Sequence, residues 1–186
     1  MSTNLTDLVI LSIVARKNAV CTDIISVVKD IAGEYWSPTG DVLCEAIEEL
    51  ISKRFLEIQQ STLDGECLQI TKTGLEEFSS LLLRLRDRDT EIRYSRLLEL
   101  VQLRSLDLVP ATVARIIIEQ MLQRANSLIE KLERREQVPG PEGRFIGAWL
   151  SAEKQDLNNR ANILSEIAKT NLLSNEICLE DGRPFQ

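Results

Sequence analysis

The chain has 186 residues, of which 44% are hydrophobic and only 4% aromatic, a composition that suits one large or two small folded domains built mainly from helices. Its formal net charge of -7 and its pI near 4.8 argue against nucleic acid as a partner, because affinity for polyanions rests largely on counterions released by lysine and arginine. Histidine, the most common general base, is absent, and no glycine-rich phosphate loop occurs, so we expect neither an enzyme with catalytic residues nor a bound cofactor.

The four cysteines, Cys21, Cys44, Cys67 and Cys178, stand far apart in the sequence and form no CxxC pair. Without histidine, a zinc site would need thiolates and carboxylates alone, so we expect reduced, mostly packed thiols and no metal. The acidic residues predicted to surround Cys44 also argue against a reactive thiolate at that position.

The amino-terminal sequence MSTNLTDLVILSIVARK has an apolar run of about seven residues that is preceded by an acid and has no basic leader. This pattern does not fit a secretory signal. No run approaches the ~20 apolar residues of a membrane span. We therefore expect a cytoplasmic protein that has no membrane partner.

Two short helices are predicted at the start of the chain. The first is expected from Leu5, where apolar positions continue as far as Val14. The second is expected from Cys21, or the residue after it, to Gly33, because glycine tolerates the left-handed conformation that often ends a helix.

Ser37 followed by Pro38 predicts the start of a third helix, with a side-chain acceptor at the N-cap and an imino acid where no N–H partner is needed. A single core-facing stripe recurs at helical spacing and consists of Leu43, Ala46, Ile47 and Leu50. The polar positions expected to face outward include Asp41, Glu45, Glu48 and Ser52.

The sequence FLEIQQSTLDGECLQIT alternates apolar and polar residues on either side of Asp64-Gly65, a dipeptide that favours the positive φ of a hairpin turn. A further helix is predicted after Thr71. Three helices, a β-hairpin and another helix in this order describe a winged helix-turn-helix, a unit known to read DNA grooves. We therefore expect residues 1–87 to form such a domain.

Beyond residue 87 the pattern predicts long helices over about 90–106, 110–135 and 144–168, and the prolines and glycines of EQVPGPEG separate the last two. The apolar stripe of the middle helix is too wide to be left uncovered in water, so it needs either an intramolecular bundle or a second copy. We favour a twofold homodimer, in a mainly α protein with one small hairpin, in which residues 88–186 form a helical dimerisation domain. The predicted interface residues are Ile117, Met121, Leu122, Leu128 and Trp149.

The order of these elements, together with particular residues, resembles the PadR family of winged-helix regulators. The run YWSPTGDVLCEAIEELISKRFLE is similar to that family's third helix, with Trp36, Pro38, Leu43 and Ala46 at matching positions. ITKTGLEEF matches the family's Leu-Thr-x-x-Gly junction between the wing and the fourth helix, and LVILSIVARKNAVCTDII resembles its first helix. The carboxyl half is similar to the dimerisation arm of longer members, so the resemblance covers almost the whole chain.

The resemblance implies a transcriptional regulator that binds double-stranded DNA as a homodimer through its third helix and wing. It also implies a small-molecule effector between arm and winged domain, where Trp36 and Trp149 are candidate lining residues, although tryptophan more often belongs to a core. DNA contacts need hydroxyl donors toward base edges and cations toward phosphates. The candidates of these two kinds are Arg16, Lys17, Ser37, Thr39, Ser52, Lys53, Arg54 and Lys72.

The departures from the family concern charge. Cys44 stands in place of the family's tyrosine, Asp41 in place of a glycine, and Glu48-Glu49 where members commonly have basic residues. Two like unit charges about 8 Å apart at an effective ε of about 40 repel by ~1 kcal/mol, so these carboxylates oppose phosphate. The alternative hypothesis is a winged-helix protein that has lost DNA binding and acts as a protein-interaction or DNA-mimicking adaptor. Its acidic face would consist of Asp41, Glu45, Glu48 and Glu49.

Overall fold

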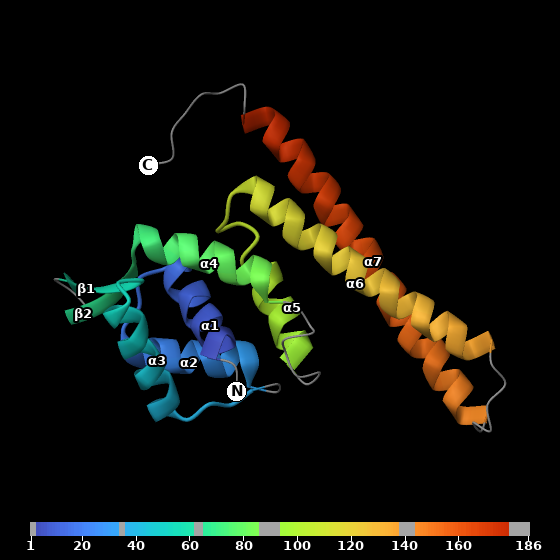
Figure 1. Cartoon of the computed structure of the whole chain (residues 1–186), viewed down its shortest axis with the longest axis horizontal. Helices are drawn as coiled ribbons and strands as arrows, with labels where there is room; N and C mark the ends of the chain where they lie inside the picture. Colours follow the sequence, from blue (N-terminus) through green and yellow to red (C-terminus); the bar gives the residue numbers. More distant parts are fainter. Residues whose placement is uncertain (1–2, 34–35, 62–64, 86–93, 138–143, 179–186) are drawn as a thin grey trace. The chain divides into compact units, whose positions relative to one another are not determined.

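The computed structural model describes residues 3–33, 36–61, 65–85, 94–137 and 144–178, which form seven helices and one two-stranded hairpin (Figure 1). The expectation of a mainly α fold with a small hairpin is confirmed. The chain divides into two compact units, Met1–Val113 and Ala114–Gln186. The elements are α1 (Thr3–Arg16), α2 (Cys21–Ala32), α3 (Gly40–Ser52), β1 (Leu56–Ser61), β2 (Gly65–Ile70), α4 (Lys72–Arg84), α5 (Ser95–Arg104), α6 (Ala111–Gln137) and α7 (Arg144–Cys178).

The first helix, α1, is the centre of the first unit and contacts α2, α3, α4, α5 and β2 (Figure 1). A helix that is apolar on all sides is stable only when other elements cover all of it. That condition is met here, because every side chain from Leu5 to Val14 is buried. The few polar members of this buried run are Thr6, Asp7 and Ser12, and the Ser12 hydroxyl donates to the Val9 carbonyl at 2.7 Å.

The second and third helices pack against α1 and against each other. α2 ends at Ala32 as expected, but Gly33 has φ -52° and ψ -31°, so the prediction of a left-handed residue there was wrong. The helix simply ends with a right-handed residue whose N–H donates to the Lys29 carbonyl.

The third helix begins two residues later than predicted, at Gly40 rather than directly after Ser37. Residues 36–39 are not helical, and Thr39, with φ -71° and ψ 156°, is the N-cap, although its side chain makes no capping hydrogen bond. The non-helical segment lets Trp36 reach the core, where only 7% of its surface is exposed. The core-facing stripe is confirmed, since its four members are all buried: Leu43, Ala46, Ile47 and Leu50.

The hairpin follows α3 as predicted. β1 and β2 pair antiparallel, from Leu56 opposite Ile70 to Ser61 opposite Gly65, while Asp64 of the predicted turn lies outside the described residues. Ala19, between α1 and α2, extends the sheet by one bridge, because its N–H and carbonyl pair with Leu68 at 3.3 and 2.9 Å. α1 to α3, this hairpin and α4 therefore form a winged helix-turn-helix.

The junction between the wing and α4 is held by a network around Thr71. The Thr71 hydroxyl caps α4 by accepting from the Gly74 N–H at 3.0 Å, and it donates to the Arg54 carbonyl at 2.7 Å. A Cβ atom at position 74 would collide with the Phe55 carbonyl and lie 2.9 Å from Ile70 Cγ1. Glycine is therefore required at position 74 by close packing, which gives the Thr-x-x-Gly pattern a structural cause.

The fifth helix belongs to the first unit, because α5 contacts α1 and α2. The amide of the buried Gln102 donates to the Leu82 carbonyl of α4 at 3.2 Å, which further fixes α5 in place. The compact units therefore divide after Val113, whereas the predicted domain boundary lay between residues 87 and 88. α5 is also shorter than the predicted helix over 90–106, of which residues 90–93 lie outside the described ranges.

The remaining helices, α6 and α7, form a helix–loop–helix arm and lie side by side (Figure 1). Buried leucines recur every seventh position along α7, at Leu150, Leu157 and Leu164, which is the spacing of a coiled-coil seam. An ion pair of 3.3 Å between Lys154 Nζ and Glu133 Oε1 links the two helices. α7 is ten residues longer than predicted, since it ends at 178 rather than at 168.

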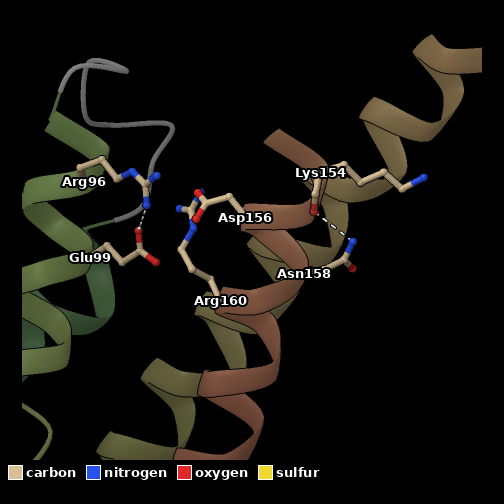
Figure 2. Close-up of polar contacts among 6 residues, drawn as sticks. All are labelled: Arg96, Glu99, Lys154, Asp156, Asn158 and Arg160. Carbon is tan, nitrogen blue, oxygen red and sulfur yellow. Dashed lines mark hydrogen bonds and ion pairs between the residues drawn. The ribbon is translucent and has the colours of Figure 1, made fainter. Parts of the chain in front are cut away.

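Polar pairs within single helices lie on α5 and α7 (Figure 2). In α7, Arg160 Nη2 lies 2.5 Å from Asp156 Oδ2, and the Asn158 amide donates to the Lys154 carbonyl at 3.0 Å. In α5, Arg96 and Glu99 form a longer ion pair of 3.5 Å. Such pairs within one helix each contribute only a few tenths of a kcal/mol.

Candidate nucleic-acid interface

The outer face of α3 is solvent-exposed and acidic. Asp41, Glu45, Glu48 and Glu49 are all exposed, and α3 itself contains no lysine or arginine. Only Glu49 has an ion-pair partner within the described ranges, Lys53, whose Nζ lies 2.7 Å from Glu49 Oε1. The hydrogen bond that Lys53 donates to the Glu49 carboxylate raises the pKa of Lys53, with burial acting in the opposite direction. The first three carboxylates are therefore free to face a ligand.

The carboxyl end of α3 is a Schellman motif, with an arginine where glycine is usual. The Phe55 N–H donates to the Leu50 carbonyl and the Arg54 N–H to the Ile51 carbonyl, both at 2.9 Å. Arg54 has φ 60°, a left-handed conformation that costs a non-glycine residue roughly 1–2 kcal/mol. Its side chain is exposed. The fold thus holds a cation at the end of α3 at an energetic cost.

Two more exposed cations lie beside this region. Lys72, the first residue of α4, sits between Thr71 and Thr73, both of which donate to the Arg54 carbonyl, so Lys72 and Arg54 belong to one junction. Lys17 directly follows α1 and precedes Asn18. Within the described ranges, none of Lys17, Arg54 and Lys72 forms an ion pair with another side chain.

Other predicted contacts are already engaged within the chain. The Arg16 guanidinium forms a 2.7 Å ion pair with Asp107 and donates to the Arg104 carbonyl. The Ser52 hydroxyl donates to the Glu49 carbonyl at 2.7 Å. Ser37 and Thr39, by contrast, are exposed just before α3. The residues predicted to contact DNA therefore fall into two groups. One group has hydroxyls and cations without an internal partner among the described residues, and the other is already bound within the chain.

The wing offers no positive charge. Residues 56–70 contain no lysine or arginine, and the described carboxylates, Glu57 and Glu66, are exposed. The Gln60 amide donates to Glu66 Oε1 across the strands at 3.0 Å, and the Asn18 amide donates to Gln59 Oε1 at 3.4 Å. The asparagine contact places the end of α1, and with it Lys17, beside the wing.

A buried carboxylate lies below this surface, at a position that no pattern in the sequence singles out. Asp7 of α1 is buried, and its Oδ1 atom has no hydrogen-bond partner within the described residues. Burial raises the pKa of Asp7 from 3.8 to about 6; Lys53 lowers it, while Glu49 and Glu77 raise it. The acidic end of α3 therefore acts on the protonation of Asp7.

Two cysteines that are remote in the sequence meet at the start of α2. Cys21 Sγ and Cys44 Sγ lie 3.8 Å apart, and both residues are half-buried. Burial and the contact with Cys44 raise the pKa of the Cys21 thiol. The prediction of packed thiols did not include this pairing, because 23 residues separate the two positions.

The predicted dimer-interface residues differ in exposure. Ile117 and Met121 are buried within the single chain, so they are packing residues and present no surface to a partner. Leu122 is half-buried, whereas Leu128 and Trp149 are exposed, Trp149 by 61%. Other exposed apolar residues in α6 and α7 are Ile116, Phe145, Ile146 and Ile163.

The arm also has a hollow of about 430 Å³ on α7, lined by Asn162, Ile163, Glu166, Ile167 and Thr170. Neither tryptophan lines it. Trp36 is a core residue, and Trp149 is exposed in the other unit, so the hypothesis of an effector site between them stays a prediction. Among the described residues no cluster of three or more potential metal ligands occurs, and no helix is long and apolar enough to cross a bilayer.

No protein-family model matches the chain, and no curated protein sequence matches it either. Among solved structures it is similar to Bacillus subtilis PadR in complex with operator DNA, at 15% identity and a TM-score of 0.40, over 89% of this chain and 98% of that chain. Bacillus subtilis PadR and its complex with p-coumaric acid each match at 14% identity and a TM-score of 0.42, over 92% of this chain and 97% of theirs.

Proposed function

We propose that this chain is a PadR-like transcriptional regulator that binds double-stranded DNA as a homodimer through α3 and the wing. The observation that carries the proposal is that the core covers one side of α3 and leaves the opposite side open to solvent. A helix presented in this way fits the width of a major groove. The residues behind the family resemblance also have structural roles here, since Trp36 is buried and Gly74 packs against Phe55.

Phosphate contacts would come from Arg54 and Lys72 at one junction and from Lys17 beside the wing. Arg54 is the strongest candidate of these. Its left-handed backbone costs free energy that glycine would not, so the presence of arginine there suggests a role for its side chain. Three free cations per subunit give six in a dimer. Binding of these six cations to phosphates would release counterions from the DNA, which predicts a slope of about -5 for log K against log salt concentration.

The carboxylates of α3 fit this proposal as readers of bases. Residues 40–70 contain seven carboxylates and only two cations, so non-specific attraction is weak. A carboxylate in the major groove can still accept from the cytosine N4 amino group. We assign that role to Glu45, the exposed carboxylate in the second turn of α3. Ser37 and Thr39 would donate to base edges or phosphates from the amino-terminal end of α3.

Dimerisation would use the helical arm, the region from Ala114 onward. Phe145, Trp149 and Ile163 are 79%, 61% and 59% exposed, although large apolar side chains are usually buried. A second copy of the arm would cover them, and twofold pairing is the commonest assembly. Trp149→Ser should raise the dissociation constant of the dimer roughly 30-fold, the size expected for a buried aromatic anchor.

The test is selection of binding sites from random double-stranded DNA by the full chain at about 50 mM salt, where electrostatic attraction is strong. We expect enrichment of a palindromic sequence with cytosine at fixed positions. Glu45→Ala should relax the preference at those positions, and Arg54→Gln with Lys72→Gln should weaken binding to all sequences. Lys169→Gln, which removes an arm lysine paired with Glu166, is the matched control. Failure to enrich any sequence would refute the proposal.

A second candidate function is supported by the charge of the same surface. The excess of carboxylates over residues 40–70 also suits docking on a basic protein, in which the acidic face formed by Asp41, Glu45, Glu48 and Glu49 imitates nucleic acid. The regulator would then act through a protein partner in the cytoplasm.

Charge removal on α3 distinguishes the two functions. In a variant with Asp41→Asn and Glu48→Gln, which keeps the base-reading Glu45, DNA affinity should rise several-fold under the first function, because repulsion of phosphate is reduced. Under the second, a stoichiometric partner captured by the wild-type chain in the presence of nuclease should be lost from the variant. Capture that is unchanged in the variant would exclude the acidic face as the docking surface.

A further inference from the structure

We propose that Cys21 and Cys44 form a reversible disulfide when the protein meets a hydroperoxide, joining α2 to α3. The two sulfur atoms already lie 3.8 Å apart in the reduced protein. Cys21 is the first residue of α2, and Cys44 is the fifth residue of α3, so the bond would connect the two helices of the helix-turn-helix. No other described thiol is paired in this way.

The positions suit a redox reaction because both thiols are half-buried, neither sealed in the core nor fully solvated. A small hydroperoxide can therefore reach them, while a short rearrangement of two contacting side chains brings the sulfur atoms to bonding distance. Burial and the Cys44 contact raise the pKa of Cys21, so its reaction with peroxide should be slower than that of an activated cysteine.

The reaction balances with one hydroperoxide per disulfide. One sulfur, as thiolate, attacks the peroxide oxygen and becomes a sulfenic acid, and the O–O bond breaks to release water from hydrogen peroxide. The second sulfur then attacks the sulfenic sulfur, the new S–S bond forms, and a second water leaves. Two thiols are oxidised by two electrons while hydrogen peroxide is reduced to two waters. A dithiol reverses the reaction by exchange.

Cys67 provides an internal control. It is buried, and its thiol donates to the Gln59 carbonyl at 3.5 Å within the hairpin. It therefore has a different partner from the Cys21–Cys44 pair and less access to solvent, and we expect it to stay reduced under the same treatment.

The experiment treats the reduced full chain with hydrogen peroxide, alkylates the remaining thiols and maps the peptides by mass spectrometry. We expect a cross-linked peptide pair containing Cys21 and Cys44, the loss of two hydrogen atoms from the intact mass, and recovery of both thiols with dithiothreitol. The bond should also raise the melting temperature by roughly 5–10 °C, because it restricts the unfolded chain.

Matched variants complete the test. Cys21→Ser or Cys44→Ser should abolish both the cross-link and the rise in melting temperature, whereas Cys67→Ser should retain them. Peptide mapping of the unaltered chain needs no variant, so a variant that fails to fold does not decide the result. Alkylation of Cys21 and Cys44 after peroxide treatment, or cross-links that join either of them to another cysteine, would overturn the proposal. None of these readouts depends on DNA binding.

Discussion

The two tryptophans differ in exposure between the winged unit, residues 1–113, and the helical arm, residues 114–186. Trp36 is 7% exposed in the winged unit, whereas Trp149 is 61% exposed in the arm. In the winged unit, five elements cover the central helix α1, so its core is complete in one chain. In the arm, two helices share a leucine seam but leave aromatic residues in water. The difference indicates that the core of the winged unit is closed within one chain, and the exposed aromatic residues of the arm agree with our proposal that a second copy covers them.

The largest expected effect comes from truncating the two tryptophans. Trp36→Ala should lower the free energy of unfolding by about 3–5 kcal/mol, because it leaves a cavity in a closed core. Trp149→Ala should cost less than ~1 kcal/mol in dilute protein, since an exposed side chain has little to lose. Chemical denaturation of both variants measures these free energies of unfolding. Equal losses would remove the distinction between the two regions.

A matched pair of glycines sharpens the comparison. Gly74→Ala in the winged unit should destabilise by on the order of 3 kcal/mol, because the new Cβ atom collides with the Phe55 carbonyl. Gly147→Ala in α7 should instead stabilise by about 0.5–1 kcal/mol, since nothing lies within 4 Å of the new methyl and alanine favours a helix. Melting temperatures of the two variants should move in opposite directions. A tolerated Gly74→Ala would contradict the close packing at the wing junction.

The closed core of the winged unit also predicts a pH dependence of stability. Burial raises the pKa of Asp7 to about 6 in the folded chain, against 3.8 for an ordinary aspartate. The folded state thus holds this proton more tightly than the unfolded state, so stability from this group is greatest at low pH and is lost as pH rises from about 4 to about 6. After allowance for solvent screening, the loss is on the order of 2 kcal/mol.

Asp7→Asn should remove most of this pH dependence, and Asp23→Asn, at an exposed position of α2, should leave it unchanged. Urea denaturation between pH 4 and pH 7 provides the measurement. If the stability of the wild type and of both variants changed by the same amount across that interval, Asp7 would not be the group responsible.

The smallest effect concerns the end of α3. Arg54→Gly should stabilise the winged unit by about 1 kcal/mol, because glycine adopts the left-handed conformation without a steric cost. Arg54→Ala, which removes the charge and keeps the backbone cost, should leave stability within about 0.5 kcal/mol of the wild type. Both variants should bind DNA more weakly. Destabilisation by glycine would show that the arginine side chain itself supports the fold.

Local patterns in the sequence were enough to predict most of the winged unit. The stripe from Leu43 to Leu50 faces the core because helical spacing leaves it no other arrangement. The Thr-x-x-Gly pattern predicted the start of α4, since its threonine side chain caps that helix. The start of α3 was missed by two residues, because the burial of Trp36 in an extended segment outweighed the local helix signal at Ser37 and Pro38.

Contacts between distant positions could not be predicted from the same patterns. Arg16 was expected to touch phosphate, but it pairs with Asp107, 91 residues away. The Cys21–Cys44 contact likewise depends on how α2 packs on α3. The left-handed backbone at Arg54 was hidden because that position usually carries glycine. The first two features arise from tertiary packing and the third from a local helix cap, and the apolar spacing along a single helix reveals none of them.

The most direct test of the central claim, that the open side of α3 and its flanking cations bind DNA, is a salt titration of the full chain on a selected DNA site. We expect log K to fall linearly with log salt concentration with a slope of about -5, and Arg54→Gln with Lys72→Gln to reduce the magnitude of that slope to about 2. A slope near zero, or no saturable binding at about 50 mM salt, would contradict it.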